Sequence, residues 1–215
     1  NNDYARIQDP YALNFEAEEI RHELSVIEEE QFGDSVAYDT LEKDQYVDSI
    51  TIPLDINKRV NLALQYFQTK GRKVFTIWLE RSGKYEKMIK EILRDEGLPT
   101  ELFYLAMIES GFNPKARSYA RASGMWQFIY ATGSHYGLRA DWWFDERRDP
   151  LLATRAAAQH LNDLYERFGN WHLALAGYNY SPGKLASKIR RYNTNDFWQI
   201  RGLPRQTRNY IPTFI

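Results

Sequence analysis

The sequence contains no cysteine among its 215 residues. Disulfide bonds and thiolate zinc sites are therefore excluded, and so is a lipid attached to a cysteine of this chain. The four histidines, His22, His135, His160 and His172, show none of the spacings that metal ligands have. We therefore predict no metal site and no cofactor, and ordinary surface or core-edge positions for these histidines.

Long apolar runs are also missing. No stretch approaches the roughly 20 residues that a membrane-spanning helix needs, and no signal peptide is recognisable. We expect any membrane anchor to lie outside this chain. Alternation of apolar and polar residues is scarce as well, which predicts an all-α architecture with at most a small β-hairpin.

The net charge of −1 hides an uneven distribution. Residues 1–50 carry fourteen acidic and three basic side chains, a net charge of −11, whereas residues 51–215 carry 25 basic and 15 acidic side chains, a net charge of +10. A basic domain suits an anionic polymer or surface, which includes peptidoglycan, nucleic acid and anionic lipid. No nucleic-acid-binding motif accompanies the charge, so we predict no nucleic-acid partner.

Two parts are predicted from these differences: an acidic extension or linker over residues 1–50, and a helical domain over residues 51–215. Residues 15–30 have the apolar spacing of an amphipathic helix, with Ile20 and Leu24 on its apolar face, and residues 33–49 have little periodicity. Two roles stay open for the extension. Either it covers part of the basic surface and limits the access of the substrate, or it is a flexible tether.

Apolar periodicity and breaking residues outline the helices of the domain. Asn57 is a suitable N-cap for a first helix, whose inward residues we predict as Val60, Leu64 and Phe67. The expected helices run from Asn57 to Gly71, from Gly71 to Gly83, over residues 84–96, 99–109, 125–136, 150–168, 171–178 and 182–191, and from 205 onward.

Glu109 is the most informative residue. It ends an apolar stripe with helical spacing: Leu102, Leu105, Ala106 and Glu109. Gly111 is a typical helix stop. Desolvation and the negative end of the helix dipole both disfavour the charged carboxylate, so we expect the pKa of Glu109 to be raised, as a general acid requires. The alternative is a partly solvated glutamate at a helix end.

Four short blocks occur in order along the chain: Glu109-Ser110, Gly124-Met125-Trp126-Gln127, Gly177-Tyr178-Asn179 and Gln206-Thr207-Arg208-Asn209-Tyr210. They resemble the blocks Glu-Ser, Gly-Leu-Met-Gln, Ala-Tyr-Asn and Glu-Thr-Arg-x-Tyr of the family 1 lytic transglycosylases, which have a soluble-lytic-transglycosylase-like catalytic domain. The aromatic residue in the second block and the helical segment before Glu109 are most similar to the membrane-bound D type of that family. The resemblance covers about residues 52–215.

Three departures from the family pattern stand out. Gly177 replaces the usual alanine. The run Tyr180-Ser-Pro-Gly183 replaces a small, glycine-rich run, and Gln206 replaces a glutamate. We expect these changes to affect the rim of the cleft and the rate more than the class of reaction.

The resemblance implies a lysozyme-like helical domain with a substrate cleft. It also implies cleavage of the β-1,4 bond between N-acetylmuramic acid and N-acetylglucosamine in peptidoglycan glycan strands. In this scheme Glu109 protonates the leaving oxygen and then accepts the proton of the muramyl C6 hydroxyl, which attacks C1. A 1,6-anhydro-muramyl end forms without water. The implied location is the bacterial cell envelope, in the periplasm, and at the outer membrane if an anchor lies outside this chain.

The remaining site residues take their roles from matching positions. Substrate contacts are implied at Ser118, Gly124, Met125, Gln127, Tyr178, Asn179 and Tyr210, and Tyr178 is also implied to help set the protonation of Glu109. Each has an ordinary alternative: Ser118 as a loop serine, Gly124 as a turn, Gln127 on a helix surface, Tyr178 in the core and Asn179 as a helix C-cap. Sugar rings stack on aromatic side chains, which makes cleft candidates of Trp126, Trp142, Trp143 and Tyr210.

The blocks supply one carboxylate, whereas most glycosidases use two. Further candidates lie close together in the sequence: Asp141, Asp145, Glu146 and Asp149. Local ion pairing and capping of the helix at Pro150 explain them more economically. Two alternative functions stay open: a muramidase or chitinase-type hydrolase, and a catalytically weak module that binds peptidoglycan.

Overall fold

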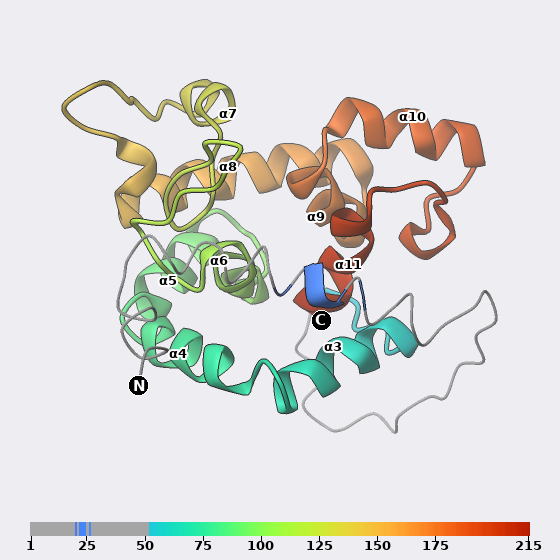
Figure 1. Cartoon of the computed structure of the whole chain (residues 1–215). Coiled ribbons are helices and arrows are strands. Elements are labelled where there is room, and N and C mark those ends of the chain that lie inside the picture. Colours follow the sequence, from blue (N-terminus) through green and yellow to red (C-terminus); the bar gives the residue numbers. More distant parts are fainter. Residues whose placement is uncertain (1–19, 21, 25, 27–51) are drawn as a thin grey trace. The chain divides into compact units, whose positions relative to one another are not determined.

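The computed structural model describes residues 20, 22–24, 26 and 52–215 (Figure 1). These residues form two compact units. The first contains Ile20 and Lys70–Gln159, and the second contains the described residues of Arg21–Thr69 together with His160–Ile215. The boundary that we predict between residues 50 and 51 lies outside the described residues, so it stays a prediction.

The first unit is built from short helices joined by irregular segments. Its helices are α4 (Arg72–Ser82), α5 (Glu86–Asp95), the 3-10 helix η2 (Thr100–Leu102), α6 (Phe103–Ser110), α7 (Tyr130–His135), the 3-10 helix η3 (Glu146–Arg148) and the start of α8 (Pro150–Phe168). Helix α5 packs against α6 and η2. Its buried residues are Ile89, Ile92 and Leu93, which recur at helical spacing.

The second unit is also built from helices. These are α3 (Lys58–Gln68), the part of α8 from His160, α9 (Trp171–Asn179), α10 (Pro182–Tyr192), the 3-10 helix η4 (Phe197–Gln199) and α11 (Arg205–Phe214). Helix α11 packs against both α3 and α9. Asn57 caps α3 as predicted, because its Oδ1 accepts hydrogen bonds from the N–H groups of Arg59 and Val60 at 3.0 and 3.2 Å.

A side-chain cluster in the second unit ties the segment before α3 to later elements. The carboxylate of Asp55 accepts a hydrogen bond from the indole N–H of Trp198 at 2.8 Å, and its Oδ2 lies 3.4 Å from Nδ1 of His172. Nε2 of the same imidazole lies 2.8 Å from the carbonyl oxygen of Pro53. His172 is thus a buried structural residue of α9 rather than a surface or core-edge residue.

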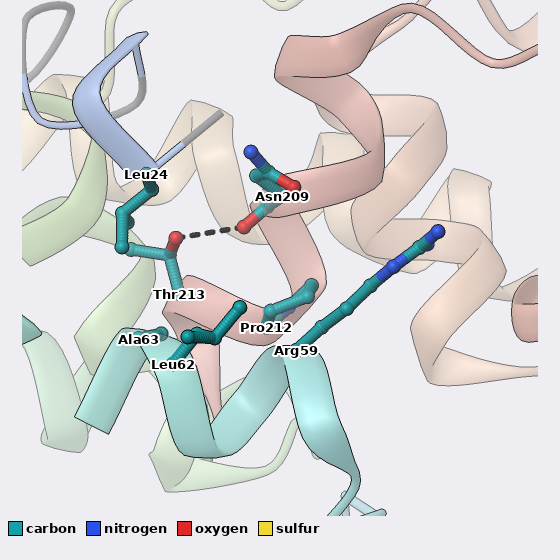
Figure 2. A pocket seen from close by; sticks show the side chains of 7 residues that line it. All are labelled: Leu24, Arg59, Leu62, Ala63, Asn209, Pro212 and Thr213. Carbon is teal, nitrogen blue, oxygen red and sulfur yellow. Dashed lines mark hydrogen bonds between the residues drawn. The ribbon is translucent and has the colours of Figure 1, made fainter. Parts of the chain in front are cut away.

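Figure 2 shows a pocket of the second unit, between α3 and α11. It is lined by Leu24, Arg59, Leu62, Ala63, Asn209, Pro212 and Thr213. The hydroxyl of Thr213 donates to the backbone carbonyl of Asn209 at 2.7 Å, inside the helix that contains Pro212. The lining is mostly aliphatic and includes none of the predicted site residues, so this pocket is not the candidate active site.

The predicted all-α architecture is confirmed. In the part of the chain that the structure describes, strand-like pairing is limited to isolated bridges such as Ser123↔Phe128, and no helix is long and apolar enough to cross a membrane. Residues 20, 22–24 and 26 are helical, and Ile20 and Leu24 are buried as predicted. The other residues of the predicted extension helix, and the segment 33–49, lie outside the described residues.

Two details of the predicted helices are wrong. Leu64 of α3 is exposed, and Leu62, Ala63 and Tyr66 are buried beside Val60 instead. The helix predicted over residues 125–136 begins only at Tyr130, because the backbone of Gln127 is left-handed with φ of 50°. A left-handed residue of this kind interrupts an α-helix.

Candidate active site

Glu109 lies in the last turn of α6, and 8% of its surface is exposed. The helix ends because Gly111 adopts the left-handed conformation, with φ of 57°, and its N–H bonds back to the carbonyl of Met107 at 2.7 Å. A side chain at Gly111 would also overlap the indole ring of Trp78. The sequence therefore places a buried carboxylate at a sharply defined helix end.

Ser110 connects this helix end to the second block. Its hydroxyl lies 2.7 Å from the backbone carbonyl of Met125, to which it donates, and accepts the N–H of Asn113 at 3.2 Å. All three of these residues are buried. The residue next to Glu109 is thus bonded directly to the segment that contains Gly124 and Gln127.

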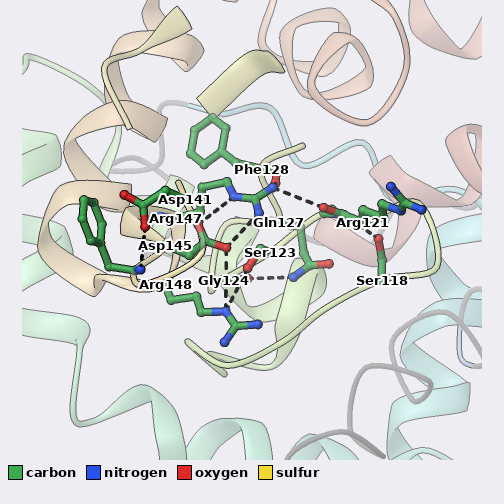
Figure 3. Close-up of polar contacts among 12 residues, drawn as sticks. Ser118, Arg121, Ser123, Gly124, Gln127, Phe128, Asp141, Asp145, Arg147 and Arg148 are labelled. Carbon is green, nitrogen blue, oxygen red and sulfur yellow. Dashed lines mark hydrogen bonds and ion pairs between the residues drawn. The ribbon is translucent and has the colours of Figure 1, made fainter. Parts of the chain in front are cut away.

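The second block forms a tight turn rather than a helix (Figure 3). Gly124 has φ of +83° and Gln127 has φ of 50°. Both the backbone N–H and the side-chain Nε2 of Gln127 donate to the carbonyl of Gly124, at 3.2 and 2.7 Å. The side chain of Gln127 is therefore held against its own turn and remains partly accessible.

Only glycine fits at position 124, because the backbone of a later segment lies close to it. A Cβ at this position would overlap the carbonyl oxygen of Arg147. Positive φ and this close approach together exclude any larger residue without movement of the backbone. The turn predicted at this glycine is present, and its contact with the substrate stays a prediction.

Arg147 stabilises the turn through hydrogen bonds to backbone carbonyls on both sides of it. Its Nη1 donates to the carbonyls of Arg121 and Phe128, at 3.2 and 3.1 Å, while its Nε and Nη2 form a bidentate pair with Asp145 at 2.8 Å each (Figure 3). The side chains of Arg147 and Asp145 are 12% and 19% exposed. One guanidinium thus joins both ends of the segment that contains the second block.

The electrostatics of this cluster keep Asp145 ionised. Burial alone would raise its pKa, but the hydrogen bonds and charge of Arg147, with a further hydrogen bond from Ser123, outweigh burial and lower the pKa of this carboxyl group. Arg148 adds a hydrogen bond to the hydroxyl of Ser123 at 3.2 Å. Sequence reasoning missed Arg147 as a supporting residue, because its carbonyl partners lie 19 and 26 residues away.

The other candidate carboxylates have local partners as well. Asp141 accepts from the N–H groups of Trp143 and Phe144, and Asp149 accepts from those of Leu151 and Leu152 at the start of α8. The backbone N–H and the guanidinium of Arg139 lower the pKa of Glu146. Ion pairing and helix capping therefore explain these residues, as predicted.

Ser118 caps its own loop, since its Oγ accepts the N–H of Ala122 at 3.0 Å. Met125 is fully buried, so its side chain offers no surface to a substrate. Trp126 is also fully buried and donates its indole N–H to the hydroxyl of Thr154 at 2.9 Å. The prediction that Trp126 lines a cleft is wrong, because the large apolar ring is better satisfied inside the first unit with a partner for its N–H.

The third and fourth blocks lie in the second unit and are bonded to each other. The side-chain oxygen of Asn179, the last residue of α9, accepts the hydroxyl of Thr207 at 2.9 Å. Tyr178 packs against the imidazole of His160, with ring centroids 5.1 Å apart. Tyr210 is fully buried and presents no ring face for stacking, whereas Gln206 is exposed.

The departure at Gly177 has a packing cause. A Cβ there would lie 2.8 Å from the ring of Phe168 and 3.2 Å from Leu164. The ring therefore occupies the space that the alanine methyl group of the family pattern would fill.

Comparison with known proteins decides the family. The family model of the transglycosylase SLT domain matches residues 86–201, which is more than half of the chain. The chain belongs to the transglycosylase SLT domain family. The matched range includes Glu109, Gly124, Gln127, Tyr178 and Asn179.

Among the relatives of this SLT domain is the membrane-bound lytic murein transglycosylase D of Escherichia coli K12. The two are 32% identical over 175 residues, which cover 78% of this chain and 38% of the relative. The chain thus spans well under half of the length of that protein. The predicted resemblance to the D type is confirmed at the level of sequence similarity.

Solved structures show the same fold. The 70 kDa soluble lytic transglycosylase of Escherichia coli superposes with a TM-score of 0.53 at 22% identity, over 60% of this chain and 22% of that enzyme. An inactive glutamate-to-glutamine variant of the lytic transglycosylase Slt from Pseudomonas aeruginosa gives a TM-score of 0.50 at 25% identity, over the same shares of the two chains. The predicted helical, lysozyme-like fold is confirmed.

Proposed function

We propose that this SLT domain is the catalytic domain of a peptidoglycan lytic transglycosylase, with Glu109 as its acid and base. The observation that carries the proposal is a buried carboxylate at the end of α6 whose neighbour Ser110 is bonded to the Gly124–Gln127 turn. Membership of the family supports the class of reaction, and the inactive glutamine variant of the Pseudomonas relative supports an essential glutamate.

The proposed reaction uses one carboxylic acid twice. Glu109 donates its proton to the glycosidic oxygen, so the bond from C1 of N-acetylmuramic acid to that oxygen breaks and N-acetylglucosamine leaves with a hydroxyl group. The carboxylate then takes the proton of the muramyl C6 hydroxyl as its oxygen forms a bond to C1. Glu109 is protonated again, no water is consumed, and a 1,6-anhydro end results.

The carboxylates near the second block support this one-acid scheme. Most glycoside hydrolases use a second carboxylate to activate water or to form a covalent intermediate. Asp145 and Glu146 are each paired with an arginine that lowers the pKa of the carboxyl group, and Asp149 caps α8. These carboxylates stabilise the local fold through their own partners. Glu109 is therefore the proposed acid.

The proposed substrate contacts are residues at positions that match the family pattern. In the first unit they are Gln127, Ser118 and the backbone at Gly124, and in the second unit they are Tyr178 and Asn179. The location proposed for the protein is the bacterial cell envelope, in the periplasm, in keeping with the membrane-bound, murein-degrading relative.

The experiment is mass spectrometry of the soluble products after digestion of purified peptidoglycan sacculi. Wild-type protein should release 1,6-anhydro-muropeptides, which are lighter by one water than reducing-end products. Glu109→Gln should keep its fold and reduce turnover by at least about 10²–10⁴-fold, the usual contribution of a positioned acid or base. Glu91→Gln, the same substitution at an exposed position of α5, is the matched control and should cleave normally.

Other products would change the conclusion. Reducing-end products would identify a hydrolase and would require a second catalytic group. Binding to sacculi without any product would identify a binding module. Near-full activity of Glu109→Gln would refute the assignment of the acid.

A further inference from the structure

Two adjacent tryptophans of the first unit are almost fully exposed. Trp142 and Trp143 are 90% and 87% exposed, although tryptophan is normally buried for most of its surface. They lie in the segment between α7 and α8, which leaves both helices as a long loop in Figure 1. Trp126, in contrast, is fully buried in the same unit. Contiguous exposed apolar surface is a feature of interaction sites.

The loop that holds the two indoles is built to a fixed shape. Oδ1 of Asp141 accepts the N–H groups of Trp143 and Phe144 at 2.7 and 3.0 Å, and the N–H of Asp141 bonds to the carbonyl of Phe144 at 2.9 Å. Behind this turn Ala140 and Asp145 form an antiparallel bridge. The indoles are therefore presented by an ordered turn, which lowers the entropy lost on binding a ligand.

The same segment carries a polar group suited to hydroxyl and amide recognition. The guanidinium of Arg139 lies over the ring of Phe144, 5.4 Å from its centroid, and remains 75% exposed. Its bonds to Glu146, at 2.9 Å and 3.2 Å, fix its orientation. Flat apolar faces and a planar donor group in one short segment match a pyranose ring, whose C–H face is apolar and whose edge carries hydroxyl and N-acetyl groups.

We propose that Trp142 and Trp143 form a platform that binds the glycan strand of peptidoglycan away from the bond that is cleaved. The platform holds N-acetylated pyranose rings by stacking, with Arg139 and Asp141 at their edges. It therefore increases the affinity of the domain for long strands, and it takes no part in proton transfer. This proposal rests on the proposed function only for the identity of the glycan.

The charges of the loop favour a glycan over a lipid surface. Residues 139–149 contain three arginines and four acidic residues, one of which, Asp141, is next to Trp142. Binding to anionic lipid requires an excess of basic residues, which this segment lacks. The carboxylate of Asp141 beside the indole would also be costly to bring into a bilayer interface.

The test measures binding without cleavage. In the Glu109→Gln background, retention on purified sacculi should fall about tenfold for the double variant Trp142→Ala with Trp143→Ala, and the pair Trp142→Tyr with Trp143→Tyr should restore much of it, because tyrosine keeps a stacking face. Tyr119→Ala removes a 77% exposed aromatic of the same unit and is the matched control, with retention unchanged. In the active background the apparent KM for sacculi should rise while kcat changes less than about twofold.

Each outcome bears on one proposal. Unchanged retention of the double alanine variant overturns the platform, and it leaves the proposed function intact if anhydro products still form. If the double alanine variant loses binding to phosphatidylglycerol vesicles but keeps its binding to sacculi, the platform proposal is also overturned. The two tryptophans then bind a membrane surface. Tryptophan-dependent binding to sacculi by a wild-type protein that releases no product supports the platform and refutes the proposed enzyme.

Discussion

The two units hold their sequence blocks in different ways. In the first unit the Gly124–Gln127 block is an irregular turn, fastened by polar contacts of Ser110 and Arg147. In the second unit Tyr178 and Asn179 end a regular helix, and α9 packs against α11 through mostly apolar residues. Irregular backbone must find its hydrogen bonds outside itself, whereas a helix satisfies its own. We therefore expect substitutions to act more severely in the first unit.

The largest effect is expected for Gly124→Ala. The new Cβ would overlap the carbonyl oxygen of Arg147, and alanine is strained at φ of +83°. The free energy of unfolding should fall by roughly 3–5 kcal/mol, the range of the severest single substitutions. Urea unfolding measures this free energy, and the rate at which sacculi are cleaved should fall together with it.

Gly137→Ala is the matched control for that substitution. Gly137 has nearly the same φ, +81°, but no atom lies within 4 Å of a Cβ there. Only the conformational strain remains, about 1–2 kcal/mol. Equal losses in the two variants would show that the close approach to Arg147 does not matter.

A smaller effect is expected for Arg147→Met. The variant loses the pair with Asp145 and two bonds to backbone carbonyls, which should lower the free energy of unfolding by about 2–4 kcal/mol. Arg139→Met removes two guanidinium hydrogen bonds to one oxygen of Glu146, and the side chain of Arg139 is 75% exposed, so the loss of stability should be clearly smaller. Comparable losses of stability in the two variants would mean that the bonds from Arg147 to the backbone of the turn add nothing to the free energy of unfolding.

The same pair gives a dependence on pH. The pKa of Asp145 is lowered from its ordinary 3.8 in the folded protein, so its ionised form stabilises the fold above about pH 4. This contribution is lost as the pH falls through the lowered pKa. In Arg147→Met the difference between the folded and unfolded pKa shrinks, so the loss of stability between about pH 5 and pH 2 should be shallower than in wild-type protein. Parallel acid profiles would contradict this cause.

The smallest effect is expected in the second unit, for Gly177→Ala. Alanine favours a helix over glycine by about 1 kcal/mol, but its methyl group would press on the ring of Phe168 at 2.8 Å. We expect the free energy of unfolding to fall by at most about 1 kcal/mol, because the edge of the Phe168 ring can shift. In a Phe168→Leu background the same change should become stabilising, and a double-mutant cycle with thermal unfolding measures the coupling. Additive effects would exclude the ring as the reason for this glycine.

Local sequence was sufficient for many of the helix ends. The ends of α8 match the prediction at Pro150 and Phe168, and those of α9 and α10 differ from it by at most one residue. The cap at Asn57 and the helix stop at Gly111 were predicted for the same reason. Periodicity, caps and breakers act within one or two turns of chain, so neighbouring residues determine them.

The sequence by itself also determined the position of Glu109 at a helix end and the order of the four blocks. The tertiary structure decided which glycine lies against Arg147, that Gln127 belongs to a turn, and that Trp126 is buried while Trp142 is exposed. These outcomes depend on partners far along the chain, as the bonds from Arg147 to Arg121 and Phe128 show. No local pattern encodes such contacts, because they form only when the chain has folded.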